Sequence, residues 1–310
     1  MRKCQILALC IVGAWPSALA DARTLEVGPG KTFALPSQAA QVAGDGDVVQ
    51  IAPGTYVDCA VWTSNDLTIE ATGPGVILSE KSCDRKGIFV INGNDVTVRG
   101  ITFQRSVVPD NNGAGIRAQG GNLTVERSSF LENQMGMLVT GSDTSRVIIR
   151  DSLFARNGNC YPHCPDDVYM HALYAGRAIA LLRVEGSEFT EQHDGHYVKS
   201  RAVRSEIIDN VIHDGDKGTG SYLIDIPDGG TLIASGNRLE KGQGLENEVA
   251  IAIGEESQRN ATPEIRIDNN SFNNTQPKST IFLWNMTKTE PSLGTNKFQG
   301  MVVPMVTGRR

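Results

Sequence analysis

The chain has 310 residues and a formal net charge of −6 at neutral pH. An acidic surface argues against nucleic acid and against anionic membranes as partners. The chain has 33 glycines, only 6% aromatic residues and one segment that predicts a helix, which is not typical of a helical or α/β domain. No segment after the N-terminal region is long and apolar enough to predict a membrane span.

Residues 1–20 have the pattern of a secretory signal peptide. Arg2 and Lys3 are basic, residues 6–14 are apolar, and residues 18–20 form a small-residue cleavage site. We therefore expect a periplasmic or extracellular protein. Its net charge would be −8, because cleavage removes two positive charges from the formal −6.

Four cysteines lie beyond the predicted signal peptide, and an even number in an exported protein predicts disulfides. Four cysteines allow three pairings. Sequence order favours Cys59–Cys83 and Cys160–Cys164.

A short unit recurs along the chain at intervals of about 23 to 35 residues. Each copy is an apolar strand that ends in an aromatic or aliphatic residue, here called the plug. The copies are 96–103, 123–130, 147–154 and 182–189, with weaker ones at 207–212, 232–239, 265–272 and near Phe298. In the later copies Asn or Asp precedes the plug, as at Asn210 and Asn237, where the chain must bend. Self-similarity at a regular period predicts a solenoid.

A second strand precedes each of these units. These strands are 87–91, 115–118, 136–139, 172–175, 197–200, 223–226, 249–253 and 280–284. Two or three short strands per turn of about 25 residues predict a single-domain parallel β-helix. Residues 36–43 predict a short helix that begins at Pro36 and Ser37, stops at Gly44 and covers the open end of the first coil. We thus expect an N-terminal cap and first coil in 21–60 and the β-helix in 61–310.

In this pattern of strands and plugs the chain resembles the right-handed parallel β-helix proteins of the pectin-lyase-like superfamily, over roughly residues 24–300. The resemblance implies an all-β, single-stranded right-handed parallel β-helix with a short N-terminal capping helix. The segments 195–202 and 221–230 are also similar to a group of exported bacterial β-helix proteins without an assigned reaction. The superfamily fold carries lyases, hydrolases, epimerases, tailspikes and adhesins, so it implies no single activity.

All five histidines lie between residues 163 and 213, and the coil period predicts which of them meet. Shifting by one coil carries His171 to His196 and then to Tyr222, which we call the first row. The same shift carries Tyr174 to Lys199 and then to Asp225, the second row. Because alternate residues of a strand face opposite sides, both rows are expected on one outer face of the β-helix.

Several further residues are expected near the two rows. Arg201 shares the face of Lys199 and should lie near Asp228. The inward register is disfavoured, because it would bury Lys199 and Asp225. His193 and His213 are expected in turns.

This face has the residue types needed for proton abstraction next to the carboxylate of a uronate sugar. Arg201 would neutralise the carboxylate, His196 or Lys199 would be the base, and Tyr222 or Tyr174 the acid. A neighbouring cation or histidine would lower the pKa of Lys199 or His196.

The sequence therefore predicts catalytic roles for one set of residues and substrate binding for another. The catalytic set is His171, His196, Lys199, Arg201 and Tyr222, and the binding set is Tyr174, Asp225 and Asp228. The predicted partner is a polysaccharide, acidic in this hypothesis, and the predicted activity is that of a uronate lyase or C5 epimerase.

The alternative is a non-catalytic surface, carbohydrate-binding or structural protein, in which the same residues pair with one another on the outer face. Lys199 would then pair with Asp225, and Arg201 with Asp228, each pair contributing about 0–1 kcal/mol. A groove where the side chains converge would favour an enzyme. Fully paired side chains with no concavity would favour the structural protein.

No resident cofactor or metal is expected. The resemblance to pectate-lyase-like members implies calcium as an alternative. A calcium ion would need an acidic cluster near Arg201, and Asp225, Asp228 and Glu255 are the candidate ligands. Hydrolysis by two carboxylates is a further alternative, with Asp225 and Glu255 or Asp228. Glu255 and Glu256 are otherwise expected as solvated rims.

The insertion at 157–170 is expected to overhang the cluster. Cys160, His163, Cys164 and Asp166 are metal-ligand types, but a small disulfide loop is the favoured interpretation. Asp166-Asp167 with Gly195-His196 is faintly similar to polygalacturonase-like hydrolases, whose Asn-Thr-Asp and Arg-Ile-Lys elements this chain lacks.

Overall fold

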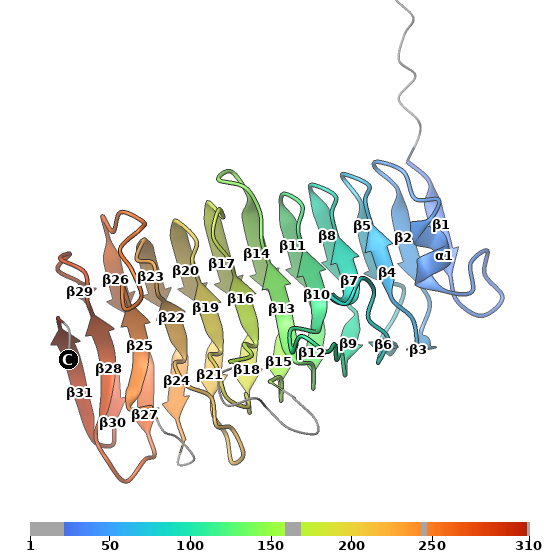
Figure 1. The fold of residues 1–310 in the computed structure, drawn as a ribbon. Coiled ribbons are helices and arrows are strands. Elements are labelled where there is room, and N and C mark those ends of the chain that lie inside the picture. The colour runs from blue at the N-terminus through green and yellow to red at the C-terminus, as the bar shows by residue number, and fades with distance from the viewer. Residues whose placement is uncertain (1–21, 159–168, 243–246, 309–310) are drawn as a thin grey trace, which may run out of the picture.

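The computed structural model describes residues 22–158, 169–242 and 247–308. It is an elongated coil of short parallel strands (Figure 1), which are hydrogen-bonded into three parallel sheets along its length. The predicted fold, a right-handed parallel β-helix, is confirmed. Each complete coil contributes one strand to every sheet, so the period of about 25 residues corresponds to three strands.

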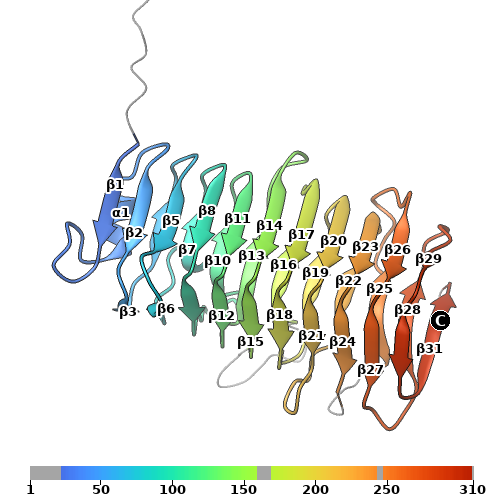
Figure 2. The same ribbon diagram turned by 180° about the vertical axis from the view of Figure 1, so that it is seen from behind.

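The eleven-stranded sheet A is best seen from behind (Figure 2). Its strands are β1 (Thr24–Val27), β2 (Val48–Ile51), β5 (Thr68–Ala71), β8 (Val96–Arg99), β11 (Leu123–Glu126), β14 (Arg146–Arg150), β17 (Leu181–Glu185), β20 (Arg204–Ile208), β23 (Thr231–Ser235), β26 (Ile265–Asp268) and β29 (Ser292–Leu293).

The ten-stranded sheet B follows sheet A in each coil. Its strands are β3 (Gly54–Tyr56), β6 (Val76–Ser79), β9 (Thr102–Gln104), β12 (Ser129–Leu131), β15 (Leu153–Ala155), β18 (Glu188–Thr190), β21 (Val211–His213), β24 (Arg238–Lys241), β27 (Ser271–Asn274) and β30 (Lys297–Gln299).

The ten-stranded sheet C holds the strands that were expected to precede each repeat unit. Its strands are β4 (Ala60–Trp62), β7 (Gly87–Ile91), β10 (Ala114–Ala118), β13 (Met135–Val139), β16 (Leu173–Ala175), β19 (Val198–Ser200), β22 (Ile224–Ile226), β25 (Val249–Ile253), β28 (Thr280–Asn285) and β31 (Val302–Thr307).

Each repeat unit is two strands with a sharp bend between sheets A and B, where a single strand was expected. A residue with a positive φ makes this bend in successive coils, for example Gly100 (71°), Asp151 (49°) and Asn269 (56°). Gly and Asn adopt this left-handed conformation at low cost. The strand of sheet B begins one or two residues after this bend. The bend therefore sets the direction of that strand, and the side chain of its plug points into the core.

The interior is held by stacks that repeat from coil to coil. The plugs Phe103, Phe130, Phe154 and Phe189 are fully buried, and their ring centroids are 5.3, 4.6 and 4.5 Å apart. At the bend, buried asparagines form a hydrogen-bonded ladder. Asn237 Nδ2 donates to Asn270 Oδ1 (2.9 Å), and Asn237 Oδ1 accepts from Asn210. This satisfies the backbone and amide groups that the bend would otherwise bury without partners.

The predicted capping helix is present, but it is shorter than 36–43. Helix α1 (Pro36–Ala40) lies at the N-terminal end of the coil (Figure 1), where it packs against β1 and β4. Pro36 and Ala39 are buried, and Ala39 belongs to the main core. The helix therefore covers the end of the coil, as a terminal repeat requires.

The disulfide Cys59–Cys83 is confirmed, with a Cα–Cα distance of 5.5 Å. The predicted Cys160–Cys164 pair, His163 and the signal peptide lie outside the described residues. No described helix is long and apolar enough to cross a membrane.

His193 lies in a connecting segment, as expected, but the prediction that His213 lies in a turn is wrong. His213 ends β21, and its Nε2 is 3.1 Å from Glu188 Oε1.

Candidate functional site

The outer face of sheet C carries the second row in the predicted register. Tyr174 is paired with Lys199, and Lys199 with Asp225, on the adjacent parallel strands β16, β19 and β22. The alternate residues Leu173 and Val198 are buried in the main core. Because alternation is strict within a strand, the Tyr174 and Lys199 side chains leave the sheet on the opposite, outer side.

The first row is also confirmed as a stack of rings on this face. The ring centroids are 4.9 Å apart between His171 and His196, and 4.8 Å apart between His196 and Tyr222. His171 Nδ1 accepts the backbone N–H of His196 (3.0 Å), and His196 Nδ1 accepts the backbone N–H of Tyr222 (3.2 Å). In a neutral imidazole the proton is then on Nε2, so both rings are donors at their outer nitrogen.

Both histidines are held neutral. Burial, and then the positive charge of Lys199, lowers the pKa of His171 to about 3. Burial, and then the neighbouring ring of His171, lowers the pKa of His196 well below its usual range. The expected direction for His196 is confirmed. Because its Nδ1 lone pair is already used, His196 presents a hydrogen-bond donor toward the outer face.

Two cations and three carboxylates form a network directly beside the histidines. Lys199 Nζ is 3.2 Å from Asp225 Oδ2 and 2.8 Å from Glu256 Oε1. Arg201 Nη1 is 2.6 Å from Asp228 Oδ1, and its Nη2 also pairs with Glu256. The predicted pairs Lys199–Asp225 and Arg201–Asp228 are confirmed, and Glu256 bridges the two cations.

Arg201 is further fixed by an aromatic ring and by a shared counterion. Its Nε–H donates to the Tyr174 hydroxyl (2.9 Å), and its guanidinium is 6.0 Å from the centre of that ring. Asp228 also accepts from Arg177 Nε (2.8 Å) and Ser257 Oγ (2.8 Å). Burial alone would raise the pKa of Asp228, but these donors outweigh it and hold the pKa below its usual value.

The expectation that outward residues of the rows would be solvent-exposed is wrong. Asp225 and Asp228 are fully buried, and the side chains of Lys199 and Arg201 are each 10% exposed. Part of the reason is the segment after β25, whose Glu256 folds back over the two cations. Such pairs lose most of their solvation, so they cannot be treated as ordinary surface pairs.

The expected lowering of the Lys199 pKa is also wrong. Burial acts in that direction, but the attraction of Asp225 and Glu256 is stronger, and the pKa is raised. Lys199 is therefore an ammonium ion at neutral pH.

Asp225 and Glu255 form a second kind of element, a pair of carboxyl groups that repel each other. Burial, and then the charge of Glu255, raises the pKa of Asp225 well above its usual value. Burial also raises the pKa of Glu255. Neither Asp225 oxygen nor Glu255 Oε2 has an aligned hydrogen-bond partner among the described residues. The pair is thus suited to hold one proton between two carboxyl groups.

Among the described residues, Asp225, Glu255 and Glu256 form the one group with the spacing of a metal-ligand set, with oxygens within 4.8 Å of one another. Asp228, which the sequence also suggested for calcium, is not in this group. The ammonium of Lys199 contacts both Asp225 and Glu256. A calcium ion among these oxygens would meet that positive charge, so the donor set does not fit the ion.

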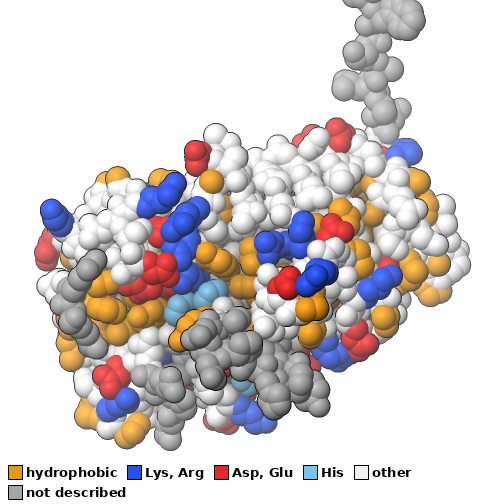
Figure 3. All heavy atoms as spheres, viewed as in Figure 1, with side chains coloured by type: hydrophobic (Ala, Val, Ile, Leu, Met, Phe, Trp, Pro, Cys, Tyr) orange, Lys and Arg blue, Asp and Glu red, His pale blue; other side chains and the backbone are white. Residues whose placement is uncertain are grey.

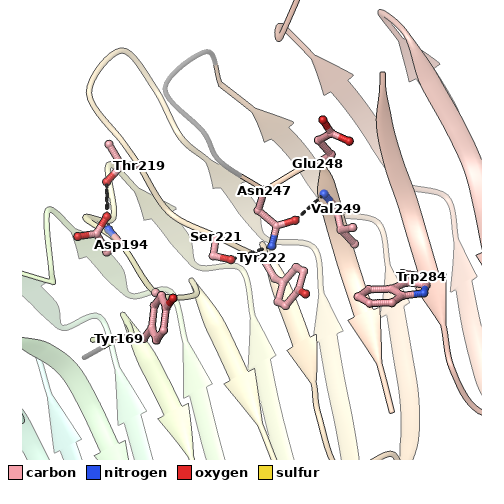
Figure 4. Close-up of a pocket in the computed structure, with 10 residues that line it drawn as sticks. Tyr169, Asp194, Thr219, Ser221, Tyr222, Asn247, Glu248, Val249 and Trp284 are labelled. Atoms are coloured by element: carbon pink, nitrogen blue, oxygen red, sulfur yellow. Dashed lines mark hydrogen bonds between the residues drawn. The ribbon is translucent and has the colours of Figure 1, made fainter. Parts of the chain in front are cut away.

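A hollow of about 550 Å³ adjoins the first row, and three aromatic residues line it: Tyr169, Tyr222 and Trp284. We call it the aromatic hollow. Figure 4 shows Tyr222 and Trp284 on neighbouring parts of the same face, with Asn247 above Tyr222. Asn247 Nδ2 donates to Ser221 Oγ (2.8 Å). Aromatic rings together with hydrogen-bonding groups in one concave surface are typical of a ligand site.

The space-filling view places the histidines on this face (Figure 3). Acidic and basic side chains gather directly above them in that view, and hydrophobic side chains lie beside them. Charge, hydrogen-bond donors and apolar surface thus meet at one place on sheet C.

The structure brings together all eight residues that the sequence placed in the site. Sequence reasoning missed the part of Glu256, which was expected, like Glu255, as a solvated rim; Glu255 was also a candidate carboxylate for calcium and for hydrolysis. Glu256 is exposed, as a rim residue would be, but it pairs with Lys199 and Arg201, and Glu255 is half-buried. Their position depends on how the loop after β25 folds back, which the strand period does not encode. Trp284 could have been found, since the register continues the second row from Asp225 through Ala252 to Trp284.

No family model matches this chain, and no curated protein matches it significantly. Solved structures with similar folds include pectate lyase Pel9A (TM-score 0.48, 12% identity, 92% of this chain and 79% of that chain). They also include YbhC of Escherichia coli (TM-score 0.47, 9% identity, 95% and 88%). A third is an alginate lyase from Paenibacillus (TM-score 0.46, 15% identity, 90% and 99%). Similarity at this level carries no inference about activity.

Proposed function

We propose that the protein binds an acidic polysaccharide on the outer face of sheet C and abstracts the proton next to a uronate carboxylate, as a lyase or C5 epimerase. The observation that supports this most strongly is the way Glu256 bridges Lys199 and Arg201. A single carboxylate fits between these two cations. The Glu256 side chain is 42% exposed, whereas each cation is 10% exposed. Glu256 is therefore the partner that a substrate carboxylate could replace.

In this proposal Lys199 and Arg201 hold the uronate carboxylate and neutralise the charge that develops when the adjacent proton leaves. Tyr174 and Asp228 position the guanidinium of Arg201. A carboxylate whose pKa is raised is a better base than an ordinary one at neutral pH. Glu255 is half-buried and burial raises its pKa, so it is our candidate for the base, with Asp225 sharing its proton.

Elimination would proceed with atoms and electrons balanced. The C5 proton passes to Glu255, the C–H electrons form the C4–C5 double bond, and the C4–O bond breaks. The leaving oxygen takes a proton from the Tyr222 hydroxyl. Burial, and then the charge of Glu255, raises the pKa of Tyr222, so the phenol keeps its proton at neutral pH. In an epimerase the C4–O bond would stay intact, Glu255 would keep the abstracted proton, and the Tyr222 hydroxyl would deliver a different proton to C5 from the opposite side.

The histidines have a different part in the site. His196 Nε2 carries the proton and lies 3.4 Å from Asp225 Oδ2, close to that carboxyl group but without an aligned hydrogen bond to it. His171 supports His196 through the stack. Both remain in the candidate site as donors and positioning residues.

The test is a screen of polyuronates, with neutral polysaccharides as controls, that measures unsaturated-product absorbance, reducing ends and C5 inversion together. It is run with and without a chelator, because calcium chemistry is an outcome to be distinguished. Glu255→Gln should lower turnover at least a hundredfold with little change in KM. Glu256→Gln should lower KM, because the internal competitor for the two cations is weakened.

Glu264→Gln is the matched control, because it removes one exposed acidic group beside sheet A, away from the site. It should leave turnover and KM unchanged. If Glu255→Gln keeps full turnover, or if Glu256→Gln raises KM, the assigned roles are wrong.

The second candidate function is binding without catalysis. It is favoured by the ion pairing, since Lys199 and Arg201 are already satisfied by carboxylates within the chain. Binding of an acidic polysaccharide with no product in any assay would establish this function and overturn the catalytic one.

A further inference from the structure

A second hollow of about 390 Å³ lies further along the outer face of sheet C. Arg117, Arg177 and Arg201 line it together with Tyr174, so we call it the arginine hollow. Arg117 comes from β10 and lies in the same row as Tyr174, because the register pairs it with Leu138 and Leu138 with Tyr174. This hollow therefore continues the second row beyond the candidate site.

Arg117 differs from the other two arginines of this hollow. Arg177 and Arg201 both pair with Asp228, whereas the side chain of Arg117 forms no ion pair or hydrogen bond with the described residues, and its Nε is buried without a partner. Its pKa is lowered by burial, with no carboxylate acting against it. A half-buried guanidinium without a counterion costs stability.

The row partners of Arg117 give no structural reason for a charge. On the adjacent strands these partners are Val90 and Leu138, both buried and apolar. A leucine would continue this apolar row with better packing. Asp84 and Asp110 line a neighbouring hollow together with Arg117, but neither forms an ion pair with it, and Asp110 pairs with Arg85 instead. A cation that is unfavourable for folding is typical of a residue kept for binding.

We propose that Arg117 anchors a second anionic group of the bound polymer, a carboxylate or a sulfate ester, in the arginine hollow. The inference rests on the proposed binding of an acidic polysaccharide and deepens it. Arg117 and Lys199 are three strands apart in the row, which corresponds to about 14 Å at the spacing of parallel strands. This backbone separation is longer than one sugar, which favours a ligand of more than one unit. The ligand is thus an oligomer that lies along the β-helix axis, with anionic groups on more than one unit.

The test compares wild type with Arg117→Leu by titration calorimetry, using oligouronates of increasing length. The affinity of the variant for long oligomers should fall roughly tenfold, as expected when one charge-assisted contact is lost. Affinity for the shortest oligomer that binds should not change. The melting temperature of the variant should equal or exceed that of wild type, because the unpaired charge is gone.

Arg105→Gln is the matched control, since Arg105 is an exposed arginine next to sheet B that pairs with Glu80. It removes the same net charge without touching the hollow. A parallel series with sulfated glycans shows whether the anionic group is a carboxylate or a sulfate ester. Neutral oligomers should bind no more weakly to the variant than to wild type.

The outcomes separate this inference from the proposed function. If wild type forms product but Arg117→Leu keeps wild-type affinity at every length, only the anionic subsite is overturned. An equal loss of affinity with Arg105→Gln also overturns it, because the change in net charge alone would then explain both losses. If wild type forms no product but binding depends on Arg117 and on length, the catalytic proposal fails and the subsite stands. No binding of any anionic polymer overturns both.

Discussion

The β-helix carries two stacks of rings, one inside and one outside, and they have different requirements. The inner stack of Phe103, Phe130, Phe154 and Phe189 has centroids 4.5 to 5.3 Å apart. The outer stack of His171, His196 and Tyr222 has a similar spacing, 4.9 and 4.8 Å. The coil repeat sets the spacing in both. The inner rings need only volume, whereas each outer histidine also accepts a backbone hydrogen bond and can titrate.

The largest expected effect is in the inner stack. Phe154→Ala should lower the free energy of unfolding by about 3–5 kcal/mol, because it removes a fully buried ring between two others and leaves a cavity. Urea unfolding measures the change, and Phe154→Leu should lose less. A loss below about 1 kcal/mol would mean that neighbouring coils collapse into the space.

The outer stack should make the free energy of unfolding depend on pH, which the inner stack cannot do because its rings do not titrate. His171 is neutral in the folded protein with a pKa of about 3, against 6.5 for an unperturbed histidine. The unfolded state therefore binds more protons as the pH falls below about 6.5, and stability is lost. Between about pH 7 and pH 4, wild type should lose on the order of 2 kcal/mol relative to His171→Gln. Glutamine can still accept the hydrogen bond from the His196 backbone N–H but does not titrate. If the free energy of unfolding falls equally with pH in both proteins, the prediction is contradicted.

The carboxyl pair next to the outer stack should have the opposite pH dependence. The folded pKa of Asp225 lies well above 3.8, so the folded state holds a proton that the unfolded state releases. Its contribution is fully present below about pH 4 and is lost as the pH rises through the raised folded value. Wild type should lose stability relative to Asp225→Asn over that rise. Urea unfolding at several pH values measures how the free energy of unfolding changes with pH. If Asp225→Asn loses more stability than wild type as the pH rises, the pKa of Asp225 is not raised in the folded protein.

The smallest stability effect is expected at the solvent end of the outer stack. Tyr222→Phe keeps a ring stacked on His196 and removes only a half-buried hydroxyl. The free energy of unfolding should therefore change by less than about 1 kcal/mol. Turnover on a polyuronate should nevertheless fall roughly a hundredfold, since the proposed acid is lost. A stability loss above about 2 kcal/mol with normal turnover would make Tyr222 a structural residue.

Periodicity explains how much of the site could be predicted. The one-coil shift aligned Tyr174 with Lys199 and Asp225, and His171 with His196, because parallel strands fix which residues are neighbours. The same argument reached the pairing of Arg201 with Asp228. Exposure and protonation were predicted less well. Lys199 is buried and its pKa is raised, since carboxylates from other coils enclose it.

The sequence by itself determined the β-helix and the two outer rows, because these follow from local periodicity and from the spacing of stacked coils. It also indicated the capping helix, through its start and stop residues, and the Cys59–Cys83 disulfide, through the order of the cysteines. The tertiary structure decided the rest. Only the folded chain shows that Glu256 returns from the loop after β25 to bridge Lys199 and Arg201, and that Arg117 remains without a partner among the described residues. Such contacts depend on the path of irregular segments and on charge balance across coils, which no repeat in the sequence records.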